Sequence, residues 1–191
     1  MNWCAGRLPV AQVIHQRGGS LTMTELPGLT LDEVSPQVAV SVLVEALSRI
    51  HALPIEGCPF SADWSLRVSQ AEQRMYAGLV DASDFDEENL GRDPAELLSE
   101  LKSLPPLPGV SCFTHGDACL PNFLSRDGRL SGIVDWSRAG ITHPAQDWAL
   151  ALRSVRSQFG LDAERMLRVH VPIHSADEDL LRRFRVLDEF F

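Results

Sequence analysis

The segment THGDACLPN at residues 114–122 is the most informative part of this chain of 191 residues. The short apolar run at residues 111–114 is typical of a buried strand, so we expect a loop to leave that strand at His115. Asp117 then stands at an exposed loop tip, where a carboxylate can accept the proton of a substrate hydroxyl. Asn122 brings a neutral oxygen back towards a cation bound to phosphates. The loop therefore carries its polar groups in the order that phosphoryl transfer requires.

A predicted hairpin supplies a second carboxylate to the same edge. Residues 123–124 and 130–134 are largely apolar and flank the turn RDGR at residues 126–129. The second strand delivers Asp135 beside the loop that carries Asn122. A hard cation such as Mg²⁺ prefers oxygen ligands of this kind. Asn122 and Asp135 are therefore candidate Mg²⁺ ligands.

The combined pattern resembles the catalytic loop of protein kinases, H-R-D-x-x-x-x-N. Gly116 replaces the arginine, and Asp135 stands where the D-F-G aspartate of a kinase would be. Gly140 and the segment DWA at residues 147–149 follow, the latter near the start of a predicted helix. In the alternative interpretation, Asp117 and Asp135 are turn residues that cap the backbone. The joint spacing favours the kinase-like interpretation.

A narrower resemblance runs along essentially the whole chain. Besides the loop, it rests on GRLPV at residues 6–10, HALP at 51–54, CPF at 58–60 and LDEFF at 187–191. These segments are similar to those of the aminoglycoside 3′-phosphotransferases. The resemblance implies phosphoryl transfer to a hydroxyl of an aminoglycoside antibiotic, with ATP and Mg²⁺ as cofactors and antibiotic resistance as the outcome.

The resemblance also implies roles for individual residues. Asp117 would be the catalytic base, and Arg138 would be a positive group near the transferred phosphate or the substrate. Asn122 and Asp135 would hold Mg²⁺. The residues expected to support the loop without reacting are His115 and Asp147.

The segment TMTEL at residues 22–26 occupies the place of the family's interlobe hinge. The resemblance implies that the backbone of Thr24 and of Leu26 hydrogen-bonds adenine, because an extended strand leaves main-chain groups free on one edge. The alternative is a plain structural strand that ends at Pro27-Gly28.

Two acidic clusters are candidates for binding the substrate amines, one in the middle of the chain and one at its end. The residues expected in this role are Asp86, Glu87, Asp188, Glu189 and Phe191, the last through its terminal carboxylate. Hydrogen bonds between carboxylates and ammonium groups are charge-assisted and therefore strong. The alternative is a solvated loop and a frayed helix end. The family resemblance favours substrate binding.

Two segments depart from the family pattern. Trp136 and Ser137 stand where members usually have a small residue followed by glycine, and Thr142-His143-Pro144 is atypical of the most similar members. These departures keep a second hypothesis open, a kinase of the same architecture that acts on another small hydroxyl compound.

Composition and charge narrow the class of protein. The formal net charge of −9 disfavours nucleic acid as a partner and suits a polycationic small molecule, and it equally suits plain solubility. No apolar run reaches the roughly 20 residues that span a bilayer, so we expect no membrane association. The first seven residues show no secretion signal, and we expect a cytoplasmic protein. The oligomeric state stays open.

Periodicity predicts an α+β fold that is mostly helical. Short strands are expected at residues 10–15 and 21–26, and a helix is expected from Pro36 to the break at Leu53-Pro54. Further helices are expected at residues 65–80, 94–103, 145–159, 163–169 and 176–190. This outline resembles the carboxy-terminal lobe of a protein kinase, with a small β hairpin that carries the site.

Parts of a complete kinase are not found in the sequence. A phosphotransferase of this type needs a phosphate-covering loop and a strand lysine, yet the only lysine is Lys102, on a predicted helix. We therefore expect residues 1–26 to be a remnant of the amino-terminal lobe and hinge, and residues 27–191 to be the catalytic and substrate-binding lobe. Such a truncated chain is expected to bind aminoglycoside weakly and to transfer little phosphate. A third hypothesis is a non-catalytic remnant that binds amines or a partner.

Overall fold

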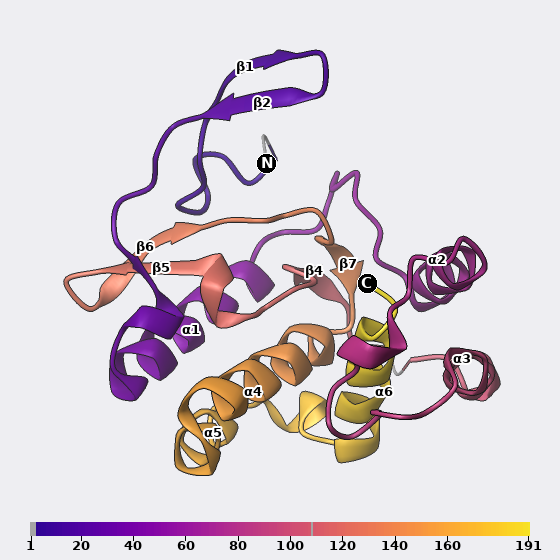
Figure 1. The fold of residues 1–191 in the computed structure, drawn as a ribbon. Helices are drawn as coiled ribbons and strands as arrows, with labels where there is room; N and C mark the ends of the chain where they lie inside the picture. Colours follow the sequence, from indigo (N-terminus) through magenta and orange to yellow (C-terminus); the bar gives the residue numbers. More distant parts are fainter. Residues whose placement is uncertain (1–2, 108) are drawn as a thin grey trace.

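The computed structural model describes residues 3–107 and 109–191, so Met1, Asn2 and Pro108 lie outside the described residues. Its helices are α1 (Pro36–His51), α2 (Trp64–Tyr76), α3 (Pro94–Ser103), α4 (Ala145–Phe159), α5 (Leu161–Arg168) and α6 (Glu178–Asp188). Its strands are β1 (Val13–Arg17), β2 (Ser20–Met23), β3 (Leu29–Thr30), β4 (Cys112–Thr114), β5 (Phe123–Arg126), β6 (Arg129–Ile133) and β7 (Gly140–Thr142). The predicted α+β, mostly helical class is confirmed (Figure 1).

The strands form three small antiparallel sheets, ordered β1-β2, β3-β5-β6 and β4-β7. The β5–β6 hairpin turns through Asp127 and Gly128, both with positive φ, and confirms the predicted hairpin. In the β4–β7 pair Thr114 lies opposite Gly140. The loop that leaves β4 therefore lies beside the segment between β6 and β7, which carries Asp135. The β4–β7 pairing thus brings the segments of Asp117 and Asp135 together.

Helix α1 begins where local chemistry predicts. Ser35 caps it by accepting a hydrogen bond from the backbone N–H of Val38, and Pro36 occupies the first turn, where a missing N–H costs nothing. One face of the helix is buried, through Ala39, Val40, Val42, Leu43, Ala46, Leu47 and Ile50. This face packs against β4, β6, α4 and α5 and forms the centre of the core. The predicted end before Leu53-Pro54 is confirmed.

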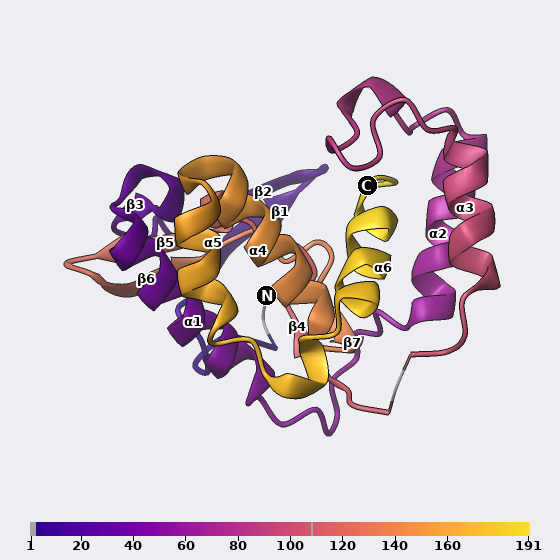
Figure 2. The same ribbon diagram turned by 90° about the horizontal axis from the view of Figure 1, so that it is seen from below.

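The remaining helices form two groups: α2 and α3 lie beside α6, and α5 packs against α4 (Figure 2). Helices α2 and α3 pack against each other and against α6, which in turn packs on α4. Two predicted helices are longer than the observed ones. Helix α2 ends at Tyr76, before Gly78 with φ of 69° and not at Val80, and α6 starts at Glu178 because Asp177 caps it. None of the helices in the described ranges is long and apolar enough to cross a membrane.

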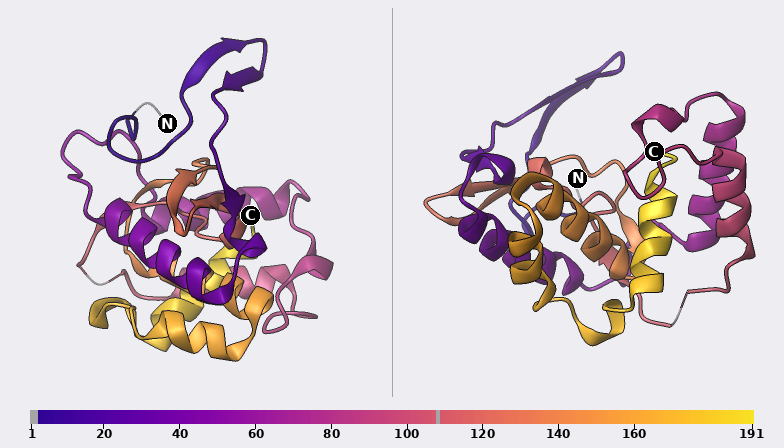
Figure 3. Two further views of the ribbon diagram at one scale, coloured as in Figure 1. Left: turned by 90° about the vertical axis from the view of Figure 1, so that its left-hand side faces the viewer. Right: turned by 60° about the horizontal axis from the view of Figure 1, so that its bottom comes forward.

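The β1–β2 hairpin projects from this body (Figures 1 and 3). Every residue of both strands is exposed. The chain before the hairpin is attached to the body where Val10 forms a bridge with Ile133, whose N–H donates to the Pro9 carbonyl at 2.9 Å. Both predicted strands are present, but β1 starts three residues and ends two residues later than predicted, and β2 ends at Met23, so Thr24 and Leu26 lie outside it. Strands β3 and β7 were not predicted.

Candidate functional site

A buried carboxylate holds the start of the catalytic loop. Asp147, in the first turn of α4, accepts hydrogen bonds from the backbone N–H of His115 at 2.9 Å and of Gly116 at 2.8 Å. His51 Nε2 also lies 2.9 Å from this carboxylate. Burial favours a raised pKa for Asp147, but the bonds from His51 and from the loop backbone hold this pKa below its ordinary value. Asp147 is therefore an anion that fixes the loop. Sequence reasoning missed the contact of His51, although His51 lies in the HALP segment.

The ring of His115 connects the two halves of the site. Its Nδ1 accepts from the backbone N–H of Asp117 at 3.3 Å, so the hydrogen of the neutral ring is on Nε2. That nitrogen lies 2.8 Å from the Val134 carbonyl and donates to it. The ring thus joins the loop to the residue before Asp135. His115 lies where the expected supporting role requires.

Gly116 is where the chain needs a glycine. Its φ is 86°, and a Cβ at this position would lie 2.0 Å from the Arg138 carbonyl oxygen. In return the Gly116 carbonyl accepts from Arg138 Nε at 3.2 Å and Nη2 at 3.0 Å, and from Gln146 Nε2 at 3.1 Å. The close approach brings Arg138 to the loop that carries Asp117.

Asp117 and Asn122 face each other across the loop. Asn122 Nδ2 donates to the Asp117 backbone carbonyl at 2.9 Å and to its Oδ2 at 3.1 Å, which directs the amide oxygen of Asn122 away from the Asp117 carboxylate. The Val134 N–H donates to the Asn122 carbonyl at 2.9 Å. The backbones of Asn122 and Asp135 therefore lie close together, although the two residues are 13 positions apart.

Asp135 is an exposed residue with φ of 51°, an uncommon conformation for a residue other than glycine. Hydrogen bonding from Ser137 lowers the pKa of Asp135, which keeps the carboxylate ionised. One amide oxygen and one carboxylate suit Mg²⁺, which usually retains several waters and takes its other ligands from phosphates. In residues 3–107 and 109–191, no group of three or more His, Cys, Asp or Glu side chains could hold a metal alone. The donor set therefore fits a cation that arrives with a nucleotide.

The model of the phosphotransferase enzyme family matches residues 1–183. The chain belongs to the phosphotransferase enzyme family. An aminoglycoside 3′-phosphotransferase of Escherichia coli is 34% identical over 201 residues, which cover 100% of this chain and 74% of that protein. The predicted resemblance to these enzymes is confirmed, and with it a phosphotransferase of the kinase type.

Solved structures of the family share the fold. The crystal structure of an aminoglycoside-3′-phosphotransferase of type VIII superposes with a TM-score of 0.88 at 30% identity, covering 100% of this chain and 77% of that one. The aminoglycoside phosphotransferase APH(3″)-Id of Streptomyces rimosus, solved with ADP and streptomycin, superposes with a TM-score of 0.85 at 25% identity, covering 99% and 78%. The kinase-like lobe expected from the sequence is confirmed.

The structure gathers most of the predicted substrate residues of this phosphotransferase beside the loop. Asp188 pairs with both Arg138 and Arg153, and Asp86 pairs with Arg153 at 2.6 Å. Burial disfavours charge on Arg153, but these two carboxylates raise its pKa. Glu189 accepts from Asn89 Nδ2 at 2.7 Å, and burial raises its pKa. These acids therefore already have partners within the chain.

The chain end lies in the same region. The ring of Phe191 has guanidinium groups near its face, those of Arg138 at 5.4 Å, Arg74 at 5.5 Å and Arg67 at 6.0 Å. A pocket of about 290 Å³ is lined by Asp81, Asp84, Asp86, Arg153, Asp188, Glu189 and Phe191, among others. Glu87 lies outside this pocket. It is exposed, lines a separate groove and makes no ion pair within the described ranges.

A second pocket, of about 280 Å³, adjoins Asp135 and lies beneath the β1–β2 hairpin. It is lined by Ala11, Met23, Ile133, Val134, Asp135, Trp136 and Ser137. Thr24, predicted to bind adenine, donates its N–H to the Gln12 carbonyl at 2.9 Å. Leu26 packs against Gly132. Neither lines the pocket, whereas Met23, which sequence reasoning passed over, does.

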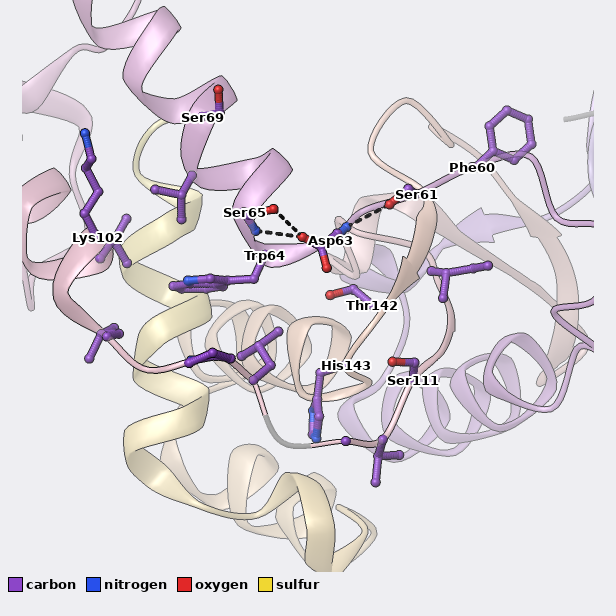
Figure 4. A pocket seen from close by; sticks show the side chains of 18 of the residues that line it. Phe60, Ser61, Asp63, Trp64, Ser65, Ser69, Lys102, Ser111, Thr142 and His143 are labelled. Carbon is purple, nitrogen blue, oxygen red and sulfur yellow. Dashed lines mark hydrogen bonds between the residues drawn. The ribbon is translucent and has the colours of Figure 1, made fainter.

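A third pocket, of about 790 Å³, lies between α2, the segment after α3, and β7 (Figure 4). Thr142 and His143 line it, so this atypical segment does not border the Asp86–Asp188 region. His143 is buried, and its Nδ1 accepts from the Ala145 N–H at 3.1 Å, which is a structural role. Lys102 also lines this pocket and pairs with Glu72 at 2.9 Å. The only lysine of the chain is therefore engaged away from Asp117 and Asp135.

Proposed function

We propose that this chain transfers the terminal phosphoryl group of ATP to a hydroxyl of an aminoglycoside, at the 3′ position. One observation carries the proposal: Asp117, Asn122 and Asp135 lie together at one edge, on a backbone that Asp147 and His115 hold in place. Phosphoryl transfer depends mainly on positioning and electrostatics, and a clamped loop supplies the positioning.

Each residue has a distinct part in the proposed reaction. The Asp117 carboxylate accepts the proton of the acceptor hydroxyl as the hydroxyl oxygen bonds to phosphorus and the bond between phosphorus and ADP breaks. Asn122 and Asp135 would hold Mg²⁺, which supplies charge neutralisation on the phosphates. Arg138 places a positive charge beside the loop, while its bonds to Gly116 and its pairing with Asp188 fix its position.

The nucleotide is proposed to enter the pocket beside Asp135. Thr24 and Leu26 do not line this pocket, but they follow Met23, which does, and they remain our candidates for contacting adenine. The Thr24 N–H is engaged by Gln12, so its carbonyl is the group available for this purpose. ATP is the proposed donor, and a kinase that draws on cellular ATP is proposed to act in the cytoplasm.

The acceptor is proposed to bind in the pocket of Asp86, Asp188, Glu189 and Phe191, whereas Glu87, which lines a separate groove, is not part of this pocket. Carboxylates in a partly closed pocket suit ammonium groups. The alternative acceptor, another small hydroxyl compound, was motivated by Trp136 and by Thr142-His143. Trp136 lines the pocket beside Asp135, and Thr142 and His143 line the third pocket. These departures from the family pattern therefore lie outside the acceptor pocket.

The test combines calorimetry with a transfer assay. We expect the 191-residue chain to bind Mg²⁺–ADP and kanamycin, and to add one phosphoryl group to kanamycin, located by NMR at the 3′ oxygen. Because Lys102 is engaged elsewhere, we expect turnover below the usual kinase range of roughly 1 to 100 per second. Streptomycin and a neutral sugar serve as comparison acceptors. Binding of neither nucleotide nor kanamycin would overturn the proposal.

A further inference from the structure

Helix α4 contacts the catalytic loop at two points. Asp147 holds the start of the loop, and the hydroxyl of Ser154 accepts from the backbone N–H of Leu120 at 3.0 Å, near its end. Asp147 and Ser154 are seven residues apart, which is about two helical turns and places both on one face of the helix. The same rigid element thus sets the positions of both ends of the loop.

The contact of Ser154 falls at a backbone position that needs a partner. Leu120 begins the short helix η3 (Leu120–Asn122), and the first N–H groups of a helix have no partner within it. Cys119 stands at the capping position, but among the described residues it makes no side-chain capping bond. Ser154 therefore caps this turn from another part of the chain. Leu120 itself is fully buried, so its N–H has little access to water.

The turn that Ser154 caps carries the proposed metal ligand. The Asn122 N–H closes the turn on the Cys119 carbonyl at 3.0 Å, and the Asn122 side chain then reaches back to Asp117. Loss of the cap would leave the turn free to unwind. The first group displaced would be the Asn122 amide, while the start of the loop would stay bound to Asp147.

We infer that Ser154 is a positioning residue that acts through η3 to hold the Asn122 oxygen at the metal position. The inference rests on the proposed function for the role of Asn122, but the capping contact can be tested without it. Ser154 does not line the acceptor pocket, so we expect its substitution to change cation binding and not acceptor binding.

The experiment compares Ser154→Ala with Ser154→Thr, which keeps the hydroxyl, and with Ser157→Ala, an exposed serine one turn away. We expect Ser154→Ala to weaken Mn²⁺ binding in the presence of ADP, measured by EPR, on the order of 5-fold, the equivalent of a lost helix cap. Kanamycin affinity should not change, and both control variants should behave as wild type.

A second readout does not depend on nucleotide. Hydrogen exchange at the Leu120 and Asn122 amides, followed by NMR, should accelerate in Ser154→Ala but not at His115 or Gly116. Unchanged exchange at Leu120 and Asn122 would overturn the inference, as would faster exchange with unchanged Mn²⁺ affinity. If wild type bound no Mn²⁺–ADP, the proposed function would fail, and the exchange data would still decide whether Ser154 holds the turn.

Discussion

The catalytic loop and the β1–β2 hairpin are both short segments, but they are held in opposite ways. The loop is bound by residues distant in sequence, through Asp147, Ser154, Arg138 and Gln146. The hairpin is held by its own ladder and by the bonds between Gln12 and Thr24. Residues of the core thus fix the loop, whereas the hydrogen bonds of the hairpin within the described ranges are local.

The difference shows which segment has its geometry fixed by the protein core and which does not. A two-stranded hairpin with no buried residue is marginal by itself and belongs to the low-stability part of a protein. The loop buries Ala118 and Leu120 in the core, and its polar anchors connect it to helix α4. Variants in or around the loop should therefore change the rate of phosphoryl transfer or the free energy of unfolding, whereas variants in the hairpin should mainly change self-association.

The largest effect is expected at Asp117, the proposed catalytic base. Asp117→Asn should lower the rate of phosphoryl transfer to kanamycin by a factor on the order of 10² to 10⁴, because the amide cannot accept the proton. Asp117 is partly buried and not at an exposed tip, but asparagine has the same shape and keeps an oxygen that can accept from Asn122, so the free energy of unfolding should change by less than about 1 kcal/mol. Single-turnover transfer and urea unfolding measure the two effects. Asp127→Asn, at an exposed turn with φ of 54°, is the matched control. Unchanged transfer would remove Asp117 from the mechanism.

The next largest effect is expected at Asp147, which holds the start of the loop. Asp147→Ala should lower the free energy of unfolding by about 3–5 kcal/mol, because it leaves buried loop N–H groups without a partner. The folded pKa of Asp147 is depressed, so its stabilisation is present above the ordinary aspartate pKa and is lost as the pH falls through the lower folded value. Urea unfolding across acidic pH measures both effects. The exposed Asp162→Ala should cost little, and equal costs would contradict the anchoring role.

A smaller effect is expected at Glu189, which borders the proposed acceptor pocket. Its pKa is raised, so the folded state favours the protonated form, and this stability is lost as the pH rises from the ordinary glutamate value through the folded pKa. Glu189→Gln should therefore gain stability relative to wild type as the pH rises across that window. Thermal unfolding over this pH range measures the trend, and a difference independent of pH would refute it.

The smallest effect is expected in the hairpin. Ile14 is 65% exposed, so Ile14→Thr should change the free energy of unfolding by less than about 0.5 kcal/mol. It should also reduce self-association, because β1 has an unpaired edge with apolar side chains. Light scattering and urea unfolding test both statements. The buried Ile133→Ala, which should cost about 2–5 kcal/mol, is the contrasting variant. A large loss in Ile14→Thr would show that the hairpin is packed in solution.

Elements governed by nearby residues were predicted well. The bounds of α3 agree with the prediction because Asp93 and Pro94 mark its start, and α4 agrees at both ends, where Gly160 follows it. Strands β3 and β7 were missed because such short strands form only through their partners, β5 and β4. The acidic clusters were recognised, but nothing in their spacing indicated that Arg153 and Arg138 would pair with them.

The amino-acid sequence alone was enough to propose the reactive groups and their order: Asp117, Asn122 and Asp135 on a loop and a hairpin, with acids proposed to bind an amine-rich substrate. It was enough because the chemistry depends on side-chain type and on spacing along one short segment. The family resemblance implied that Asp147 supports this segment, but the contact of His51 with Asp147, the cap from Ser154 and the pairing of the acids emerged only from the folded structure. Those contacts join residues up to 96 positions apart, and their partners are set by how the helices pack.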